Sequence, residues 1–266
     1  MKTPKSSYPI QGVLFFVAHP SLWGKCLHGI LFLAIVSVVS LIGFGFVIPP
    51  TAHALIRVNC PSGLAWFVAV VFMLIETFLV LFLCYILFLP LVLDRLFDAV
   101  LKLRGLGNHV PANRGYLRRI GFAGLRYVRY RLFGELLVEL PTLILTLPLN
   151  VVPGLGTGLY CYLNGLFLTW GYMLHYHVEI LGLNLSQSRE LVMKNRMDYT
   201  TFGAVALALQ LVPLGNFIFM FTNVVGCALW AADELNERIE EGHVPPKTNE
   251  SLQTEHPPLP PRPTYH

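Results

Sequence analysis

The run His175-Tyr176-His177-Val178-Glu179 gathers the residue types that most often bind metal ions or transfer protons. On a helix, His175 and Glu179 would share one face because they are four residues apart, whereas His177 would point away from them. No third ligand stands at a suitable spacing. The sequence therefore predicts no metal site here, and we expect the run to pack in the aromatic belt at a membrane interface.

Motifs of enzymes are missing from the rest of the sequence. No stretch carries the pattern of a Walker loop, a zincin or a nucleophile elbow, and the five cysteines include no CxxC pair. The clustered glycines Gly154, Gly156 and Gly158 follow a proline in an apolar stretch rather than a strand. We therefore predict a protein that is not an enzyme and that has neither catalytic residues nor a cofactor.

The composition indicates a membrane protein with several spans. Of the 266 residues, 55% are hydrophobic and only 13% are charged, and the mean hydropathy is +0.59. Soluble proteins carry about 25% charged residues, and so little charge would not keep this chain in solution. A soluble globular fold, a disordered chain and a disulfide-rich secreted scaffold are thereby excluded.

Two apolar runs, Leu27–Ile48 and Gly63–Leu93, are long enough to cross a hydrocarbon core of about 30 Å. Pro49 and Pro50 are expected to end the first run. The second contains Glu76 near its middle, and an intramembrane carboxylate is costly and usually marks function. The alternative is a protonated or hydrogen-bonded Glu76 that only fixes helix packing.

Two further apolar runs, Leu136–Val178 and Tyr199–Ala232, are interrupted by proline and glycine. The second is shorter than the roughly 40 residues that two crossings need, so we expect a hairpin that enters the membrane partway and bends at Val212–Asn216. The alternative is a single kinked span. In transporters, such broken helices place their ends at a binding site. The polar side chains can line a pathway or cap the broken helices. The candidate pathway or helix-break residues are Glu76, Asn150, Pro153, Asn164, Pro213, Asn216 and Asn223.

Between the second and third runs, residues 94–134 are basic and amphipathic. This pattern is typical of a helix that lies in the headgroup layer and binds anionic lipid, although a plain positive-inside loop would also fit. Nucleic acid is a poor candidate partner beside so much apolar chain. The candidate lipid-headgroup residues are Arg114, Arg118, Arg119, Arg126, Arg129 and Arg131.

These elements predict an all-α integral membrane protein with two long transmembrane helices, an interfacial basic helix and two half-penetrating helical hairpins. Residues 1–240 would form a single membrane domain, and residues 241–266 a disordered, Pro-rich tail. Within the tail, Pro257, Pro260 and Arg262 fit the pattern of an SH3 ligand, although the tail could simply be a solvated extension. The positive-inside rule places both termini and the basic segment in the cytosol.

Several motifs carry a resemblance to a known family. They are Tyr8-Pro9-Ile10-Gln11-Gly12, His19-Pro20-Ser21-Leu22-Trp23, Leu147-Pro148-Leu149-Asn150-Val151-Val152-Pro153, Leu163-Asn164-Gly165, Glu179-Ile180-Leu181-Gly182-Leu183, Phe202-Gly203, Val212-Pro213 and the stretch from Thr222 to Asp233. On these motifs the chain resembles the CysZ / etoposide-induced-protein 2.4 superfamily, and most closely its fungal branch of outer-spore-wall and lipid-droplet sporulation proteins. The resemblance implies two long spanning helices and two half-penetrating hairpins.

The resemblance also implies two functions. The fungal branch implies a protein of the endoplasmic reticulum or lipid droplet that supports outer spore wall assembly. Independently of the resemblance, anionic lipids and a second copy of the chain are candidate partners. The bacterial members are sulfate permeases, which makes a small-anion permease or channel the alternative. Their arginine-rich anion motif before the first long helix is absent here, where the sequence reads Pro20-Ser21-Leu22-Trp23-Gly24-Lys25. A single lysine lacks the bidentate fork of arginine.

We expect a peptide of residues 112–134 to bind vesicles that contain phosphatidylserine, because each Lys or Arg near an anionic surface contributes about 1 kcal/mol. Co-sedimentation at increasing salt should show the peptide released from the vesicles. Equal binding to neutral phosphatidylcholine vesicles, or binding that salt leaves unchanged, would contradict charge-driven recognition.

Overall fold

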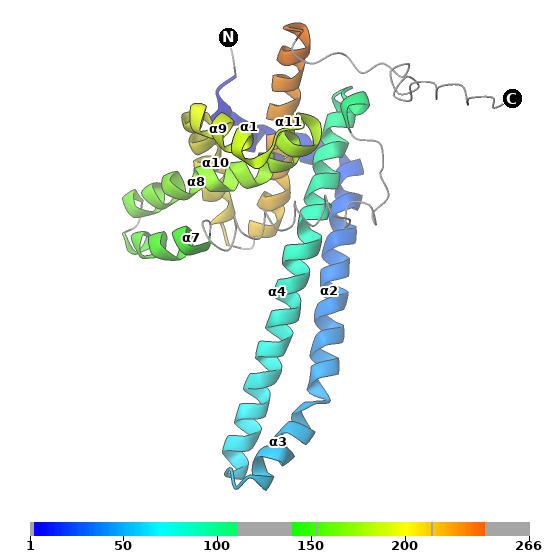
Figure 1. Ribbon diagram of the computed structural model, residues 1–266, viewed down its shortest axis with the longest axis vertical. Coiled ribbons are helices and arrows are strands. Elements are labelled where there is room, and N and C mark those ends of the chain that lie inside the picture. The colour runs from blue at the N-terminus through cyan, green and yellow to red at the C-terminus, as the bar shows by residue number, and fades with distance from the viewer. Residues whose placement is uncertain (1–2, 111–139, 153, 214, 243–266) are drawn as a thin grey trace, which may run out of the picture. The chain divides into compact units, whose positions relative to one another are not determined.

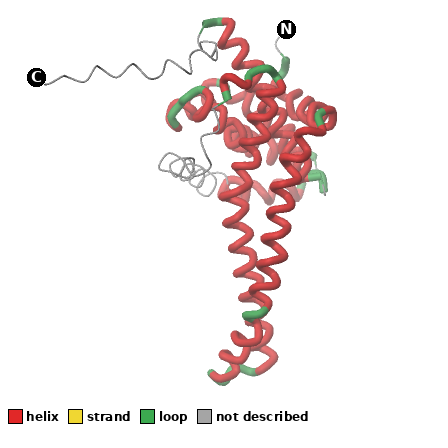
Figure 2. The backbone as a smooth tube through the Cα atoms, turned by 90° about the vertical axis from the view of Figure 1, so that its right-hand side faces the viewer, coloured by secondary structure: helices red, strands yellow, loops and turns green. Residues whose placement is uncertain are grey.

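The computed structural model describes residues 3–110, 140–152, 154–213 and 215–242, without the side chains of 85–87 and 140. Within these ranges every regular element is a helix, as the sequence predicts (Figure 2). The chain divides into two compact units. We call Phe16–Leu96 the long-hairpin unit, and Met1–Phe15 together with Phe97–His266 the bundle unit. The basic arginines, Pro153 and the Pro-rich tail lie outside the described residues.

The long-hairpin unit consists of α2 (Trp23–Gly45), α3 (Ile48–Arg57) and most of α4 (Ser62–Leu103). α2 and α4 run side by side, and α3 lies near the end where the chain turns back (Figure 1). The pairing is antiparallel: Phe32 contacts Phe88 with ring centroids 4.8 Å apart, whereas His53 contacts Trp66 at 6.1 Å.

Proline positions in this unit differ from the prediction. α2 ends at Gly45, and Pro49 and Pro50 lie in the first turn of α3 instead of ending the first apolar run at Ile48. The first N–H groups of a helix have no partner within it, so prolines are tolerated there. Pro90 likewise lies inside α4, which continues to Leu103, beyond the predicted end at Leu93.

Three helical stretches of the described chain are long and apolar enough to cross a membrane: Pro20–Arg57, Ser62–Leu103 and Asn216–Glu240. The most apolar window of the first is 0% buried within the protein, so its Leu, Ile, Val and Phe side chains need lipid around them. In the third, 72% of that window is buried, which marks it as a core helix of the bundle unit.

The bundle unit is built around α8 (Leu155–His175), α10 (Arg196–Gln210) and α11 (Asn216–Glu240). Its shorter helices are α7 (Leu140–Thr146) with the 3₁₀ turn Leu147–Val151, and α9 (Leu185–Lys194). The first residues of α1 (Tyr8–Ala18) and the last two turns of α4 also belong to it.

Pairs of glycines allow the helices of the bundle unit to touch. A Cβ atom added at Gly203 of α10 would overlap the Gly165 carbonyl oxygen of α8, and one added at Gly12 of α1 would overlap the Thr222 carbonyl oxygen of α11. Gly226 is equally close to the backbone of Tyr8. Small residues at such crossings are typical of membrane proteins, where close backbone approach supplies much of the packing energy.

The two broken apolar runs fold back on themselves. α10 ends at Gln210 and α11 begins at Asn216, and the two are antiparallel because Ala206 contacts Asn223 while Tyr199 contacts Trp230. α11 continues to Glu240, past the predicted end of the apolar arm at Ala232. In the same way α7 and the turn after it pack against α8. Half-penetration of the membrane stays a prediction for both hairpins.

Replacing Gly203 with alanine should push α8 and α10 apart and lower the free energy of unfolding by about 1–3 kcal/mol. Thermal unfolding of the purified protein in detergent, followed by circular dichroism, measures this change. Gly171→Ala is the matched control on α8, because an added Cβ there meets nothing within 4 Å. Equal melting temperatures for the two variants would contradict the close crossing.

Candidate functional site

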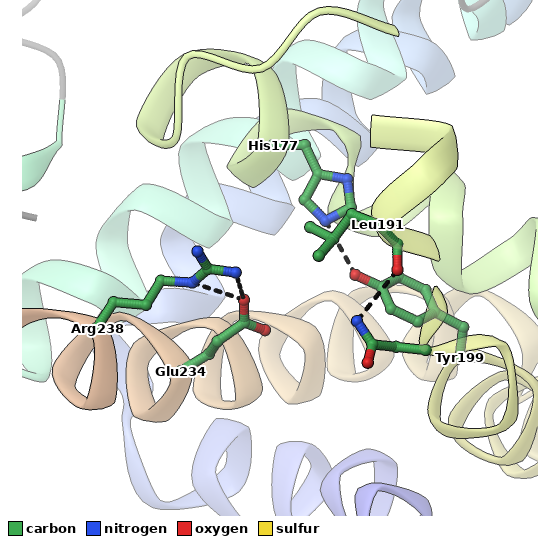
Figure 3. Close-up of polar contacts among 6 residues, drawn as sticks. His177, Leu191, Tyr199, Glu234 and Arg238 are labelled. Atoms are coloured by element: carbon green, nitrogen blue, oxygen red, sulfur yellow. Dashed lines mark hydrogen bonds and ion pairs between the residues drawn. The ribbon is translucent and has the colours of Figure 1, made fainter. Parts of the chain in front are cut away.

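A single π-helical turn, Tyr176–Ile180, follows α8 and turns His177 into the bundle unit. Such turns often occur at functional positions because the extra residue redirects side chains. His177 is fully buried, with its Nδ1 atom 2.8 Å from the Ser188 hydroxyl and its Nε2 atom 2.9 Å from the Tyr199 hydroxyl. Figure 3 shows the His177 ring facing the Tyr199 hydroxyl. The π turn, α9 and α10 therefore meet at one imidazole.

This histidine network is neutral at physiological pH. Burial, with a smaller contribution from the Arg238 charge, lowers the pKa of His177 from 6.5 to about 4. Burial also raises the pKa of the Tyr199 phenol, which therefore keeps its proton. A neutral imidazole offers one donor and one acceptor, which match its two hydroxyl partners. Ser188 additionally accepts a hydrogen bond from the Trp170 indole at 2.9 Å.

A second buried histidine joins the end of α4 to the end of α8. The His175 Nε2 atom lies 2.8 Å from the Asp98 Oδ1 atom, and the side chain of His175 is only 1% exposed. Phe97 packs edge-on against the same imidazole, with ring centroids 5.6 Å apart. His175 and His177 are thus buried in the protein core and do not themselves face lipid; the position of this run at a membrane interface stays a prediction.

Charged residues surround this core at the end of α11. Asp233 accepts hydrogen bonds from the Tyr8 hydroxyl at 2.8 Å and from the Arg104 guanidinium at 2.5 Å. One turn along, Arg238 donates two hydrogen bonds to Glu234, at 2.8 and 3.0 Å (Figure 3). The two contacts of Asp233 fix the N-terminal segment and the end of α4 to α11, whereas the Arg238–Glu234 pair lies within α11.

The geometry indicates that the buried histidines and their partners have a role in helix packing. Both ring nitrogens of His177 already have partners, and the ring has no exposed surface on which a substrate could lie. In the part of the chain that the structure describes, no three His, Cys, Asp or Glu side chains come close enough to hold a metal ion. Sequence reasoning missed Asp98, Ser188 and Tyr199, because nothing in their local sequence indicates distant partners.

Two of the predicted pathway residues, Asn164 and Asn223, are buried in helix packing. Asn164 donates to the Thr146 hydroxyl and to the Tyr160 carbonyl oxygen, both at 2.8 Å. Asn223 donates to the Ala206 carbonyl oxygen at 2.9 Å and so connects α11 to α10. Its Oδ1 atom is buried without a hydrogen-bond partner in the described chain.

The remaining pathway candidates lie elsewhere. Asn150, Pro213 and Asn216 are at the bends of the two hairpins, where they are exposed or half-buried. Asn150 donates a long hydrogen bond of 3.3 Å to the Leu147 carbonyl oxygen, which is a local turn contact. Glu76 belongs to the long-hairpin unit, where it lines a small cavity.

Both hairpin bends carry exposed apolar side chains. A small hydrophobic cluster joins them: Leu207, near the end of α10, packs with Tyr160 and Cys161 of α8, and Leu143 and Leu149 of the first hairpin pack against it. The opposite end of the second hairpin is charged, because α10 begins at Arg196 and α11 ends in acidic residues. The exposed apolar residues at the bends are Ile144, Leu145, Leu147, Val151, Val152 and Leu155 in the first hairpin, and Leu211, Val212, Phe217 and Ile218 in the second.

These features define a class: a helical integral membrane protein with a long transmembrane hairpin and a bundle of broken hairpins. A model of the family described as "Sulfate transporter CysZ/Etoposide-induced protein 2.4" matches residues 8–220, and the chain belongs to this family. The superfamily resemblance seen in the sequence is thereby confirmed. A comparison with curated proteins gave no match. The matched region contains the glycine crossing of α8 and α10 and the buried histidines.

The depressed pKa of His177 predicts a loss of stability in acid. The folded state binds this proton less tightly than the unfolded state, so the stabilisation is complete above pH 6.5 and disappears as the pH falls toward 4. The full loss would be on the order of 3 kcal/mol. Unfolding of the detergent-purified protein between pH 7 and 4.5 measures it. His177→Gln should flatten the pH dependence, whereas the exposed His53→Gln should not; identical curves for wild type and His177→Gln would rule out this role.

Proposed function

We propose that the chain is a non-enzymatic membrane protein of the endoplasmic reticulum that also enters lipid droplets, inserting both hairpins into the cytosolic leaflet. In this proposal it supports outer spore wall assembly, like the fungal proteins whose motifs it resembles. The observation that carries the proposal is the division of the bundle unit into an apolar end at the two bends and a charged end at the opposite side of the α10–α11 hairpin.

The backbone at the second bend is compatible with lipid. Leu211, Val212 and Gly215 donate their N–H groups to the carbonyl oxygens of residues 207, 209 and 212, at 3.0 to 3.2 Å. Pro213 has no N–H group to satisfy. Since lipid offers no hydrogen bonds, a bend can lie within it only when its peptide groups are paired inside the protein.

The first bend is built in the same way. Val152 donates its N–H to the Leu149 carbonyl oxygen, and Gly156 donates to Val152, each at 3.1 Å. Gly154 adopts a positive φ of 80°, a conformation that glycine tolerates and that reverses the chain there. With its apolar side chains pointing outward, this bend too suits a hydrocarbon environment.

The length of α10 supports partial insertion of this arm, whereas the 25 residues of α11 are long enough to cross a membrane. The 15 residues of α10 span about 22 Å at 1.5 Å per residue, which is less than the roughly 30 Å of a bilayer core. A lipid droplet has a single phospholipid layer with no second aqueous face, so partly inserted hairpins suit it. Arg57 at the end of α3 is exposed and needs water, so the long hairpin favours a bilayer such as the endoplasmic reticulum.

A small-anion permease is the second candidate, and two observations favour it: the sulfate transporter named in the description of the matched family, and the Glu76 carboxylate on a cavity of the long-hairpin unit. Against it stands the stretch from Pro20 to Lys25 at the start of α2, where Lys25 is exposed and no arginine is present. Transport assays with the purified protein reconstituted into proteoliposomes distinguish the two proposed functions. Uptake of radiolabelled sulfate above that of protein-free vesicles, and its loss in Glu76→Gln, would support the permease and contradict the main proposal.

We expect a fluorescently tagged chain to be in the endoplasmic reticulum during growth and on droplets when lipid accumulates. The double change Phe217→Glu and Ile218→Glu should reduce the droplet fraction severalfold while the long hairpin keeps the protein in the bilayer, because a charge in the hydrocarbon region costs about 2.5–3.5 kcal/mol. Ser186→Glu, on the polar surface of α9, is the matched control. Unchanged droplet targeting of the double variant, confirmed as folded by its melting curve, would refute insertion of this bend.

A further inference from the structure

The long-hairpin unit contains a cavity of about 180 Å³ between the α2–α3 connection and α4. Its size exceeds the roughly 150 Å³ that holds a benzene molecule in engineered protein cavities. It therefore has room for one polar head and the first carbons of an apolar chain. The lining residues are Phe44, Val47, Ile48, Thr51, Ala69, Phe72, Met73 and Glu76.

The polar groups around this cavity accept hydrogen bonds. In the described part of the chain, neither a cation nor a hydrogen-bond donor pairs with the Glu76 carboxylate. The Thr51 hydroxyl donates its proton to the Val47 carbonyl oxygen at 2.8 Å, so toward the cavity it can only accept. Next to the lining residues Phe44 and Val47 in the sequence, residues 45 and 46 have carbonyl oxygens that Pro49 and Pro50, four positions later, cannot supply with an N–H group. The cavity thus lacks a positive, donating partner.

Apolar side chains surround Glu76 on the exposed surface of α4. Ile75, Phe78 and Leu79, its neighbours on α4, are 49%, 63% and 55% exposed, on a helix with the composition of a membrane span. An ionised carboxylate in such a place is costly unless a counter-charge comes with it. A metal ion would need several oxygen ligands, which this mainly apolar lining does not offer.

We propose that this cavity binds a primary ammonium group carried on an apolar chain. The ammonium would donate hydrogen bonds to Glu76 and to the acceptors near the helix break, and it would lie against the Phe44 and Phe72 rings, which attract cations. Its chain would leave the cavity toward the lipid. Two sources share this chemistry: the amine headgroup of a membrane phospholipid, and a free long-chain amine dissolved in the bilayer.

Photoaffinity labelling of the full chain in phosphatidylcholine nanodiscs tests the site. The probe is a C18 primary amine with a diazirine in its chain, and the reference probe is its uncharged N-acetyl amide. We expect saturable labelling of peptides that contain residues 44–51 or 69–76 with the amine. Glu76→Gln should weaken apparent binding about tenfold or more, because the paired charge is lost. Glu76→Asp should retain part of it, and Glu190→Gln on the exposed α9 should behave as wild type.

Competition experiments identify which amine binds in the cavity, and they can also contradict the proposal. Displacement of the probe by added phosphatidylethanolamine indicates a phospholipid headgroup, and displacement only by unlabelled octadecylamine indicates a free amine. Equal labelling by the amide, equal competition by a long-chain alcohol or sterol, or unchanged binding in Glu76→Gln would overturn the proposal. Should Glu76→Gln not fold, as judged by gel filtration and its melting curve, the comparison of amine with amide on the wild-type chain decides the question alone.

Discussion

The hydrocarbon interior of a membrane offers no hydrogen bonds, and the fold follows from that constraint. A chain in lipid must pair its own peptide groups, which explains why the described elements are helices. The same requirement is met at most of the described prolines: they lie at the start of α3 and at the hairpin bends, where no helical N–H is lost, whereas Pro90 lies inside α4. At the second bend, Leu211, Val212 and Gly215 donate their N–H groups to nearby carbonyl oxygens.

Packing within lipid poses a second problem, because apolar side chains gain little by leaving lipid for each other. The bundle unit solves it through close backbone contact, at Gly165 with Gly203 and at Gly12 with Gly226, and through side-chain hydrogen bonds between helices from Asn164 and Asn223. The residues of the sequence motifs that indicated the family are therefore mainly contact points between helices. Membership of the family, shown over residues 8–220, is for this reason evidence of a shared fold more than of a shared cargo.

The polar core has a different physical basis from the apolar bends. His177 and Tyr199 are buried and neutral, so their network costs little electrostatic energy while it aligns the π turn, α9 and α10. Around it, the Arg104–Asp233 pair holds α11 to the end of α4, and Glu234 pairs with Arg238 within α11. Glu76 contrasts with all of these groups, because its carboxylate faces a cavity of acceptors and apolar side chains. A carboxylate without a hydrogen-bond donor or counter-charge suggests a bound ligand, whereas the paired groups of the bundle unit have a structural role.

Hydropathy and proline spacing determined the membrane class, the helical fold, the two long apolar runs and the break near Val212–Asn216, because lipid imposes these patterns along the chain itself. Tertiary structure alone decided which polar residues meet. Asp98 and His175 are 77 positions apart, Arg104 and Asp233 are 129, and no local pattern relates them. The burial of His175 and His177 among distant partners was not predicted for that reason. A sequence shows which groups are costly to bury, but only the packed helices supply the partner that removes the cost.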